Sequence, residues 1–384
     1  MHFNFTRKLI LLSSILLSSF QLFAQKKFRE VNFDDKFKKE NQGKVKIEIN
    51  ELKELIHIMI AVTDSGLEND DMVAQNTDYY KDVLRNFKIY KDEKIIIKFD
   101  SLIKANPLNY IFLTGNALSY NFKNNKLSPD RTYIFPAQTV SSHTTITNNT
   151  ISTYKKEIED FALKTNFRAF YNKHRTYYNT IISDYNRLAN LQEQWNWLER
   201  NFYAKMDNYT IMCSPLINGL NYTTSYTDND FKQIMMVLPP VDQSLKMTEK
   251  QNIVFNTRIM FTEIDHNYVG KPSDKYVHQI DIALKDRDRW IDSKKTGAEY
   301  YPNPLRIFDE YMTYAAFYLY CNDEFSDDSE TIDYAYKDVN AVMIERGFPK
   351  IKEFNDELLR LHNVNKDKKI DDLYPALLEW CQNQ

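Results

Sequence analysis

Apolar residues recur with a helical period along most of the chain. Leu52, Leu55, Ile56 and Met59 lie three or four positions apart, and Asn50 before them can cap the helix that this spacing predicts. The same spacing predicts further helices at residues 77–87, 92–103, 249–269, 274–291, 304–320, 331–346, 350–362 and 369–381, and over much of 151–206. We therefore expect a chain dominated by helices.

Strand-like stretches are fewer and shorter. Residues 45–49, VKIEI, alternate between apolar and charged side chains. Three runs rich in β-branched and aromatic residues follow one another at 209–217, 220–226 and 231–240, with turn residues between them. These runs predict a small antiparallel sheet. The expected fold class is α+β, mostly helical, with this sheet preceding the helix at 249–269.

The change of pattern near residue 207 predicts two regions. Residues 25–206 form a helical N-terminal region, and residues 207–384 contain the sheet and the C-terminal helices. The stretch 151–206 is rich in tyrosine and tryptophan, which can form a stacking platform for a glycan or a base. At helical spacing such residues more often belong to a hydrophobic core, and a core is what we expect here.

Residues 1–24 have the pattern of a secretory signal peptide. Basic residues precede the apolar stretch 9–20, and Ala24 is a small residue of the kind found at cleavage sites. A membrane anchor would need roughly 20 apolar residues, and this stretch is shorter. The pattern therefore predicts an exported protein, periplasmic or secreted, that has no stable membrane anchor and begins near Gln25 after cleavage.

Composition argues against several classes of function. The 50 basic and 53 acidic residues give a net charge of −3, so no nucleic-acid partner is expected. Only 7 glycines occur, and neither GxGxxG nor GxxxxGKS is present, which argues against a phosphate-binding loop. The cysteines Cys213, Cys321 and Cys381 lack CxxC spacing and permit one disulfide at most.

The segment FTEIDHNYVG, residues 261–270, differs by one residue from a metalloprotease motif. An HExxH helix holds zinc with two histidines four positions apart and uses the glutamate between them as a general base. Glu263 and His266 stand at the positions of the glutamate and the second histidine, whereas Thr262 replaces the first histidine. A downstream glutamate often supplies a further ligand, and Glu310 in the predicted helix at 304–320 is the candidate.

The stretch from SPLI through FTEIDHNYVG to FDEYMTYAAF resembles an uncharacterised family of exported bacterial proteins, a domain of unknown function that looks related to gluzincin-type zinc metallopeptidases. The early segments LIHIMIAVTDSG and DYYKDVLRNF are similar to the N-terminal half of that family. The resemblance implies a zincin-like fold in which Glu263 is the general base and His266 and Glu310 are zinc ligands. The strand from Ser214 to Gly219 would then line the site and offer its backbone to a peptide or protein substrate.

Thr262 is the departure from the family's pattern. A threonine hydroxyl is a poor substitute for imidazole on zinc, so the motif predicts a metallopeptidase relative whose catalysis is impaired. Other readings need no metal: a hydrogen bond could join Glu263 to His266, and Arg306 lies four residues before Glu310, where an ion pair can form. The alternative function is a non-enzymatic exported protein that binds a peptide or a glycan.

Overall fold

A computed structural model of the protein describes residues 28–140, 144–295 and 297–384. The predicted signal peptide, residues 1–24, lies outside the described residues. Helices make up 59% of the structure and strands 12%, which confirms the expected α+β, mostly helical class. Within the described ranges, no helix combines the length and the hydrophobicity needed to span a bilayer.

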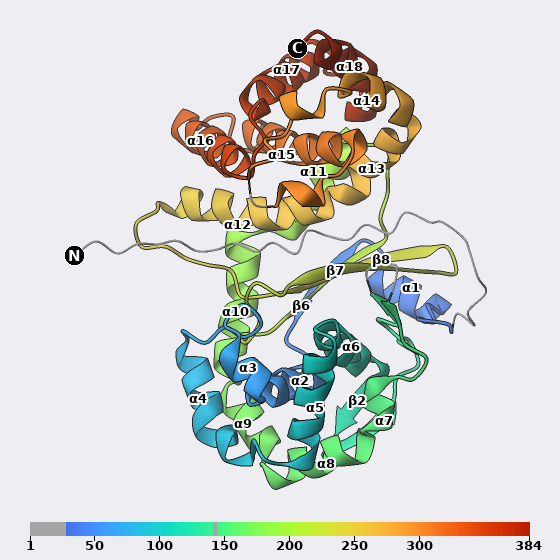
Figure 1. Ribbon diagram of the computed structural model, residues 1–384, viewed down its shortest axis with the longest axis vertical. Coiled ribbons are helices and arrows are strands. Elements are labelled where there is room, and N and C mark those ends of the chain that lie inside the picture. The colour runs from blue at the N-terminus through green and yellow to red at the C-terminus, as the bar shows by residue number, and fades with distance from the viewer. Residues whose placement is uncertain (1–27, 141–143, 296) are drawn as a thin grey trace. The chain divides into compact units, whose positions relative to one another are not determined.

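The chain folds into two compact units (Figure 1). Unit 1 comprises the residues up to Ile182 together with Met206–Pro240, and unit 2 comprises Ser183–Lys205 together with Val241–Gln384. This division differs from the predicted boundary at residue 206. The strands that follow this boundary pair with a strand from the N-terminal region, and the helix that precedes it packs on a helix of the C-terminal part.

Unit 1 contains a four-stranded sheet and a group of helices. Its strands are β1 (Lys44–Glu48), β2 (Tyr120–Lys123), β3 (Lys126–Pro129), β4 (Thr139–Val140), β5 (Thr144–Thr145), β6 (Asn208–Cys213), β7 (Tyr222–Asp228) and β8 (Phe231–Leu238). Its helices are α1 (Asp35–Asn41), α2 (Glu51–Ala61), α3 (Asp64–Glu68), α4 (Asp78–Phe87), η1 (Lys88–Tyr90), α5 (Lys94–Ala105), α6 (Asn109–Asn116), η2 (Ala117–Ser119), α7 (Thr150–Thr153), α8 (Lys155–Lys164) and α9 (Phe167–Lys173). Helix α10 (Arg175–Leu188) runs from unit 1 into unit 2.

The main sheet has the strand order β1-β6-β8-β7. Strand β7 pairs antiparallel with β8, as expected, whereas β6 lies parallel to both β1 and β8. The hairpin between β7 and β8 is closed by Asn229 and Asp230, which both have positive φ, as a tight turn between twisted strands requires. This leaves the other edge of β8 for β6. Every residue of β6 is buried, as is typical of a central parallel strand.

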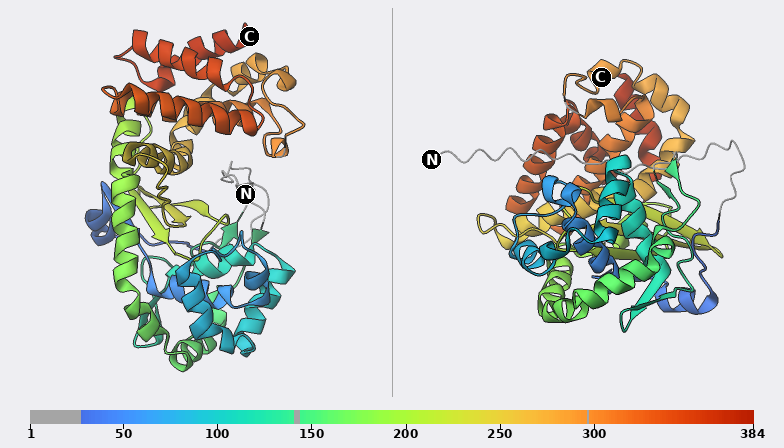
Figure 2. Two further views of the ribbon diagram at one scale, coloured as in Figure 1. Left: turned by 90° about the vertical axis from the view of Figure 1, so that its left-hand side faces the viewer. Right: turned by 60° about the horizontal axis from the view of Figure 1, so that its bottom comes forward.

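Helix α2 is the central helix of unit 1. Asn50 caps it as predicted, since its side chain accepts hydrogen bonds from the backbone amides of Leu52 and Lys53. Helices α3, α4, α5 and α6 all contact α2, and Figure 1 and the left view of Figure 2 show α2, α5 and α8 on one side of the main sheet. From Leu52 to Ala61 every residue is buried, so the helix is covered on all its faces and not on one.

Unit 2 is all helical in the residues that the structure describes. Its helices are α11 (Leu191–Asn201), α12 (Glu249–Ile264), α13 (His266–Lys275), α14 (Val277–Ala283), η3 (Arg287–Arg289), η4 (Ala298–Tyr300), α15 (Pro304–Glu324), α16 (Ser329–Glu345), α17 (Ile351–Val364), η5 (Ile370–Leu373) and α18 (Tyr374–Gln382). Helix α15 is the core helix, buried from Ile307 to Cys321, and it lies between α12 and α17 (Figure 1).

Most of the aromatic residues of the 151–206 stretch belong to the hydrophobic core, as expected. Tyr178, Tyr185, Trp195 and Trp197 are almost completely buried, while Tyr177 keeps 38% of its surface exposed. The three cysteines are all buried and free, so the one disulfide that their number permits is not formed.

Candidate functional site

The TEIDH motif lies at the end of α12. This helix begins with a capping box between Thr248 and Gln251 and ends at Ile264, and α13 begins at His266. The single predicted helix at 249–269 is therefore interrupted at Asp265. The Thr262 hydroxyl donates a hydrogen bond to a backbone carbonyl of its own helix, that of Arg258, at 2.9 Å, a common use of threonine within helices.

His266 faces helix α15. Its Nδ1 lies 3.4 Å from the hydroxyl of Thr313. Burial lowers the pKa of His266, and the nearby carboxylate of Glu310 opposes this effect, while Arg306 and Arg346 add to it. The charge of Glu310 thus acts on His266. The imidazole stays neutral at neutral pH.

Glu310 is neutralised by an arginine that the sequence did not point to. Its Oε1 lies 2.7 Å from Nη2 of Arg346, and this ion pair accounts for the buried carboxylate. Arg346 also donates hydrogen bonds to the hydroxyls of Tyr314, at 2.6 Å, and Tyr301. Its guanidinium lies 5.3 Å and 5.7 Å from the centres of the Tyr314 and Tyr301 rings, within cation–π distance.

The pKa of Arg346 is raised. Burial acts to lower it, but the charge of Glu310 and the two tyrosines outweigh burial. In the same region, burial raises the pKa of Asp265 well above its usual range, and the charges of Glu310 and Glu263 raise it further. The Glu310–Arg346 pair therefore lies beside a neutral imidazole and near a carboxyl group, that of Asp265, whose pKa is raised.

The side chains of this region do not fit a zinc ion as they stand. The carboxylate that would be a ligand is bound to a guanidinium, and the Thr262 hydroxyl is turned to its own helix. No three His, Cys, Asp or Glu side chains among the described residues are arranged to hold a metal ion. The ligand roles of His266 and Glu310 and the general-base role of Glu263 remain predictions.

The predicted substrate strand belongs to unit 1, where its backbone is already paired. Ser214 is buried, and its hydroxyl accepts a hydrogen bond from the amide of Leu216. The segment from Leu216 to Leu220 runs beside residues 70–74, with backbone hydrogen bonds at both ends and a bridge between Val73 and Ile217. Several of the backbone groups that a peptide would need are therefore already bonded within unit 1. The carboxylate of Asp71 packs closely on Gly219.

Three buried polar residues of α2, which the periodicity did not single out, lie in the core of unit 1. They are Lys53, Glu54 and His57. Glu54 Oε1 accepts a hydrogen bond of 2.6 Å from the hydroxyl of Tyr79. Burial raises the pKa of Glu54 to about 7, although hydrogen bonds from Tyr79 and Ser214 oppose the shift. Burial lowers the pKa of Lys53 to about 7 against the opposing charge of Glu48.

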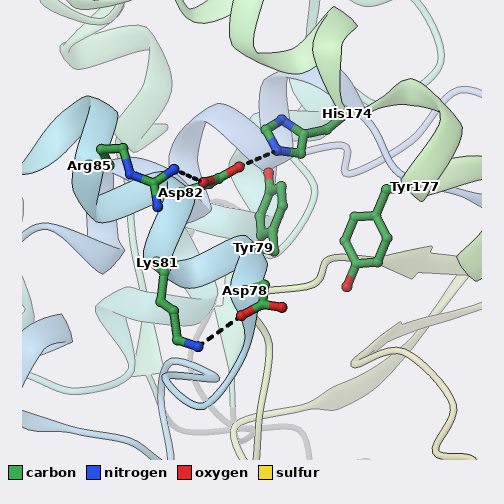
Figure 3. A pocket seen from close by; sticks show the side chains of 7 residues that line it. All are labelled: Asp78, Tyr79, Lys81, Asp82, Arg85, His174 and Tyr177. Atoms are coloured by element: carbon green, nitrogen blue, oxygen red, sulfur yellow. Dashed lines mark hydrogen bonds and ion pairs between the residues drawn. The ribbon is translucent and has the colours of Figure 1, made fainter.

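A pocket of about 640 Å³ opens in unit 1, beside this buried cluster (Figure 3). It is lined by Asp78, Tyr79, Lys81, Asp82, Arg85, His174 and Tyr177. The first five residues come from helix α4, and the last two lie at the junction of α9 and α10. Tyr79 connects the pocket to the core, because its hydroxyl is hydrogen bonded to both Glu54 and Tyr178.

No family model matches the sequence, and no curated protein or solved structure matches it either. The resemblance to gluzincin-type metallopeptidases therefore stays a prediction, made from the short motifs around Ser214, Thr262–His266 and Glu310. The proposal of a function therefore depends on where the structure places these residues.

Proposed function

We propose that this protein is an exported relative of the zincin-like metallopeptidases that has lost metal-dependent catalysis and acts as a non-enzymatic binding protein. The observation that carries the proposal is the ion pair of 2.7 Å between Glu310 and Arg346, next to His266. In a zinc site the positive charge beside such a carboxylate is the metal. Here it is a guanidinium.

Charge and desolvation explain why this arrangement opposes zinc binding. A divalent cation at Glu310 would lie beside the positive charge of Arg346, and like charges repel strongly where water is excluded. If Arg346 moved away, it would also lose its hydrogen bonds to Tyr301 and Tyr314. Separating a buried ion pair costs roughly 3–5 kcal/mol when one partner is removed. Zinc binding would have to supply that free energy with fewer ligands than usual.

The second obstacle to zinc binding is the side chain at position 262. Structural and catalytic zinc sites use Cys, His, Asp or Glu side chains, and catalytic sites retain three of them. Thr262 offers none of these groups, and its hydroxyl hydrogen bonds to the carbonyl of Arg258. His266 is the one imidazole at this motif, and a site of one imidazole and one ion-paired carboxylate would hold zinc weakly.

The test is the metal content and peptidase activity of the purified protein. We expect less than one-tenth of an equivalent of zinc, roughly, and no chelator-sensitive cleavage of a casein or peptide-library substrate. The same two measurements are made on Arg346→Gln, which removes the positive charge beside Glu310 but keeps a polar side chain. Arg360→Gln, a substitution on the surface, is the control. Stoichiometric zinc in the native protein, lost in His266→Ala, would overturn the proposal.

The export part of the proposal rests on the signal-peptide pattern of residues 1–24. N-terminal sequencing of protein recovered outside the cytoplasm should find an end near Gln25. Recovery of a chain that still begins at Met1 would contradict export by signal cleavage.

A further inference from the structure

The pocket on α4 and the α9–α10 junction has a polar wall around Asp82. The Asp82 carboxylate accepts from Arg85 and also faces Nε2 of His174 at 3.3 Å (Figure 3). Nζ of Lys173 lies 3.6 Å from the same carboxylate. His174 is in turn fixed by a hydrogen bond of 2.9 Å between its Nδ1 and the carbonyl of Phe170. Asp82 is therefore held in place from several sides and keeps a lowered pKa, because these hydrogen bonds and charges outweigh partial burial.

The lining carries two ion pairs. Asp78 pairs with Lys81 at 2.8 Å, and Asp82 pairs with Arg85. Both pairs reach solvent, since the side chains of Asp78 and Arg85 are 97% and 70% exposed. A ligand that both donates and accepts hydrogen bonds can contact a carboxylate and a cation of the same pair. The lining thus suits a polyhydroxylated ligand.

The pocket also contains an exposed aromatic ring, that of Tyr177, which lies beside a buried one, that of Tyr79. Tyr177 is 38% exposed, whereas Tyr79 beside it is 4% exposed. The two ring centres are 5.7 Å apart, with 33° between the ring planes. Tyr79 is itself anchored by its hydrogen bonds to Glu54, at 2.6 Å, and Tyr178, at 2.7 Å. The Tyr177 ring therefore offers an apolar face next to charged hydrogen-bonding groups, and the anchored Tyr79 ring lies beside it.

A peptide fits this lining less well than a sugar. The walls are helical, so they present no strand edge with which an extended peptide could pair. A pyranose ring has an apolar face of C–H groups, which packs on an aromatic ring, and a rim of hydroxyls for carboxylate and guanidinium groups. The pocket volume of about 640 Å³ lies within the usual range of small-molecule sites.

We propose that this pocket binds a neutral saccharide, with Tyr177 as the stacking platform and the Asp82–Arg85 and Asp78–Lys81 pairs as hydrogen-bonding partners of the sugar hydroxyls. The inference is independent of the proposed loss of metal-dependent catalysis, because every lining residue belongs to unit 1 and none belongs to the TEIDH region. Either proposal can fail while the other holds.

The experiment measures binding of maltose, cellobiose, lactose and chitobiose to the full chain by saturation-transfer NMR and calorimetry. We expect a millimolar or tighter dissociation constant for at least one of them. Tyr177→Ala should weaken binding by about tenfold or more, whereas Tyr177→Phe, which keeps the ring, should retain it within about threefold. Tyr300→Ala removes a tyrosine that is 54% exposed in unit 2 and should leave binding unchanged.

Three results would overturn the inference. One is the absence of binding to all four disaccharides at concentrations of about 10 mM. Another is equal binding by native protein and a Tyr177→Ala variant whose circular dichroism and melting temperature match the native protein. The third is tighter binding of inorganic phosphate than of any sugar, lost in Arg85→Ala, because this would make the pocket an anion site.

Discussion

Arg346 and Glu310 form an ion pair in unit 2, with Nη2 and Oε1 2.7 Å apart. The local sequence helps to place the arginine. Arg346 is the C-cap of α16, and Gly347 after it has a φ of 94°, a left-handed conformation that glycine adopts without strain. The end of α16 therefore delivers a cation to the carboxylate of α15. The neutralised carboxylate can remain buried without a metal ion.

This relationship predicts that restoring the missing histidine is not sufficient for zinc binding. Thr262→His alone should raise the affinity for zinc only slightly, because Glu310 is still ion-paired with Arg346. Thr262→His combined with Arg346→Gln should bind zinc at least about tenfold more tightly than either single variant. The measurement is zinc titration against a chromophoric chelator, with native protein as the reference.

Adding His266→Ala to the double variant is the control, and it should abolish the gain. If Thr262→His alone already binds zinc tightly, the guanidinium does not block the site. Our account of why the native protein lacks zinc would then be wrong.

The same pair predicts a large effect on the stability of unit 2. Arg346→Met removes the guanidinium bound to the buried carboxylate of Glu310 and should lower the free energy of unfolding by roughly 3–5 kcal/mol. Arg360→Met removes a guanidinium whose side chain is 58% exposed and should change the free energy of unfolding far less. All four tryptophans lie in unit 2. Their fluorescence during urea unfolding therefore follows this unit.

A double variant separates charge from packing. Arg346→Met with Glu310→Met replaces both charges by apolar groups and should recover a large part of the loss. If the double variant is as unstable as Arg346→Met, the loss comes from the contacts of Arg346 with its tyrosines and not from an unpaired carboxylate.

The helical content and many helix positions could be predicted from the sequence because they depend on local spacing. Helix α15 spans Pro304–Glu324 where 304–320 was predicted, and α17 spans Ile351–Val364 where 350–362 was predicted. The pairing of β6 with β8 could not be predicted in the same way. It depends on which edge of β8 the β7 hairpin leaves open, and on the distant strand β1.

The candidate site was predictable only in part, for a similar reason. The motif located His266 and Glu310, and the structure places them near each other. The sequence spacing pointed to Arg306 as a partner of Glu310, and it gave no sign that helix packing brings Arg346 from α16 to this carboxylate. The pocket at Tyr177 joins α4 to the α9–α10 junction, segments separated by about ninety residues, so no local pattern could have shown it.

Glu54 predicts a decline in the stability of unit 1 between about pH 4.5 and pH 7. Burial raises its pKa from 4.5 to about 7, so in this window the folded protein holds a proton that the unfolded chain has lost. Deprotonation favours unfolding, and stability falls as pH rises. Glu54→Gln keeps the shape without the titration. From about pH 4.5 to pH 7 the free energy of unfolding of the native protein should therefore fall by roughly a few kcal/mol relative to that of the variant.

Hydrogen exchange of the α2 backbone amides reports this stability directly, because the helix is buried in unit 1. The comparison with Glu54→Gln cancels the titration of His57, which both proteins contain. A difference that stays constant from about pH 4.5 to pH 7 would mean that the Glu54 carboxyl titrates with its ordinary pKa.

Lys53 predicts the opposite dependence at higher pH. Burial lowers its pKa from 10.5 to about 7, with the charge of Glu48 opposing the shift, and its Nζ donates a hydrogen bond of 2.7 Å to the carbonyl of Thr114. Between about pH 7 and pH 10.5 the unfolded chain holds a proton that the folded protein lacks, so this group makes unit 1 more stable as pH rises.

Lys53→Met should remove that rise, and Lys98→Met, at an exposed position of α5, should retain it. Far-UV circular dichroism during urea unfolding at several pH values in this range measures the slope. If Lys53→Met and native protein gain stability in parallel, Lys53 remains charged inside unit 1, and its hydrogen bond to Thr114 is the bond of an ammonium group.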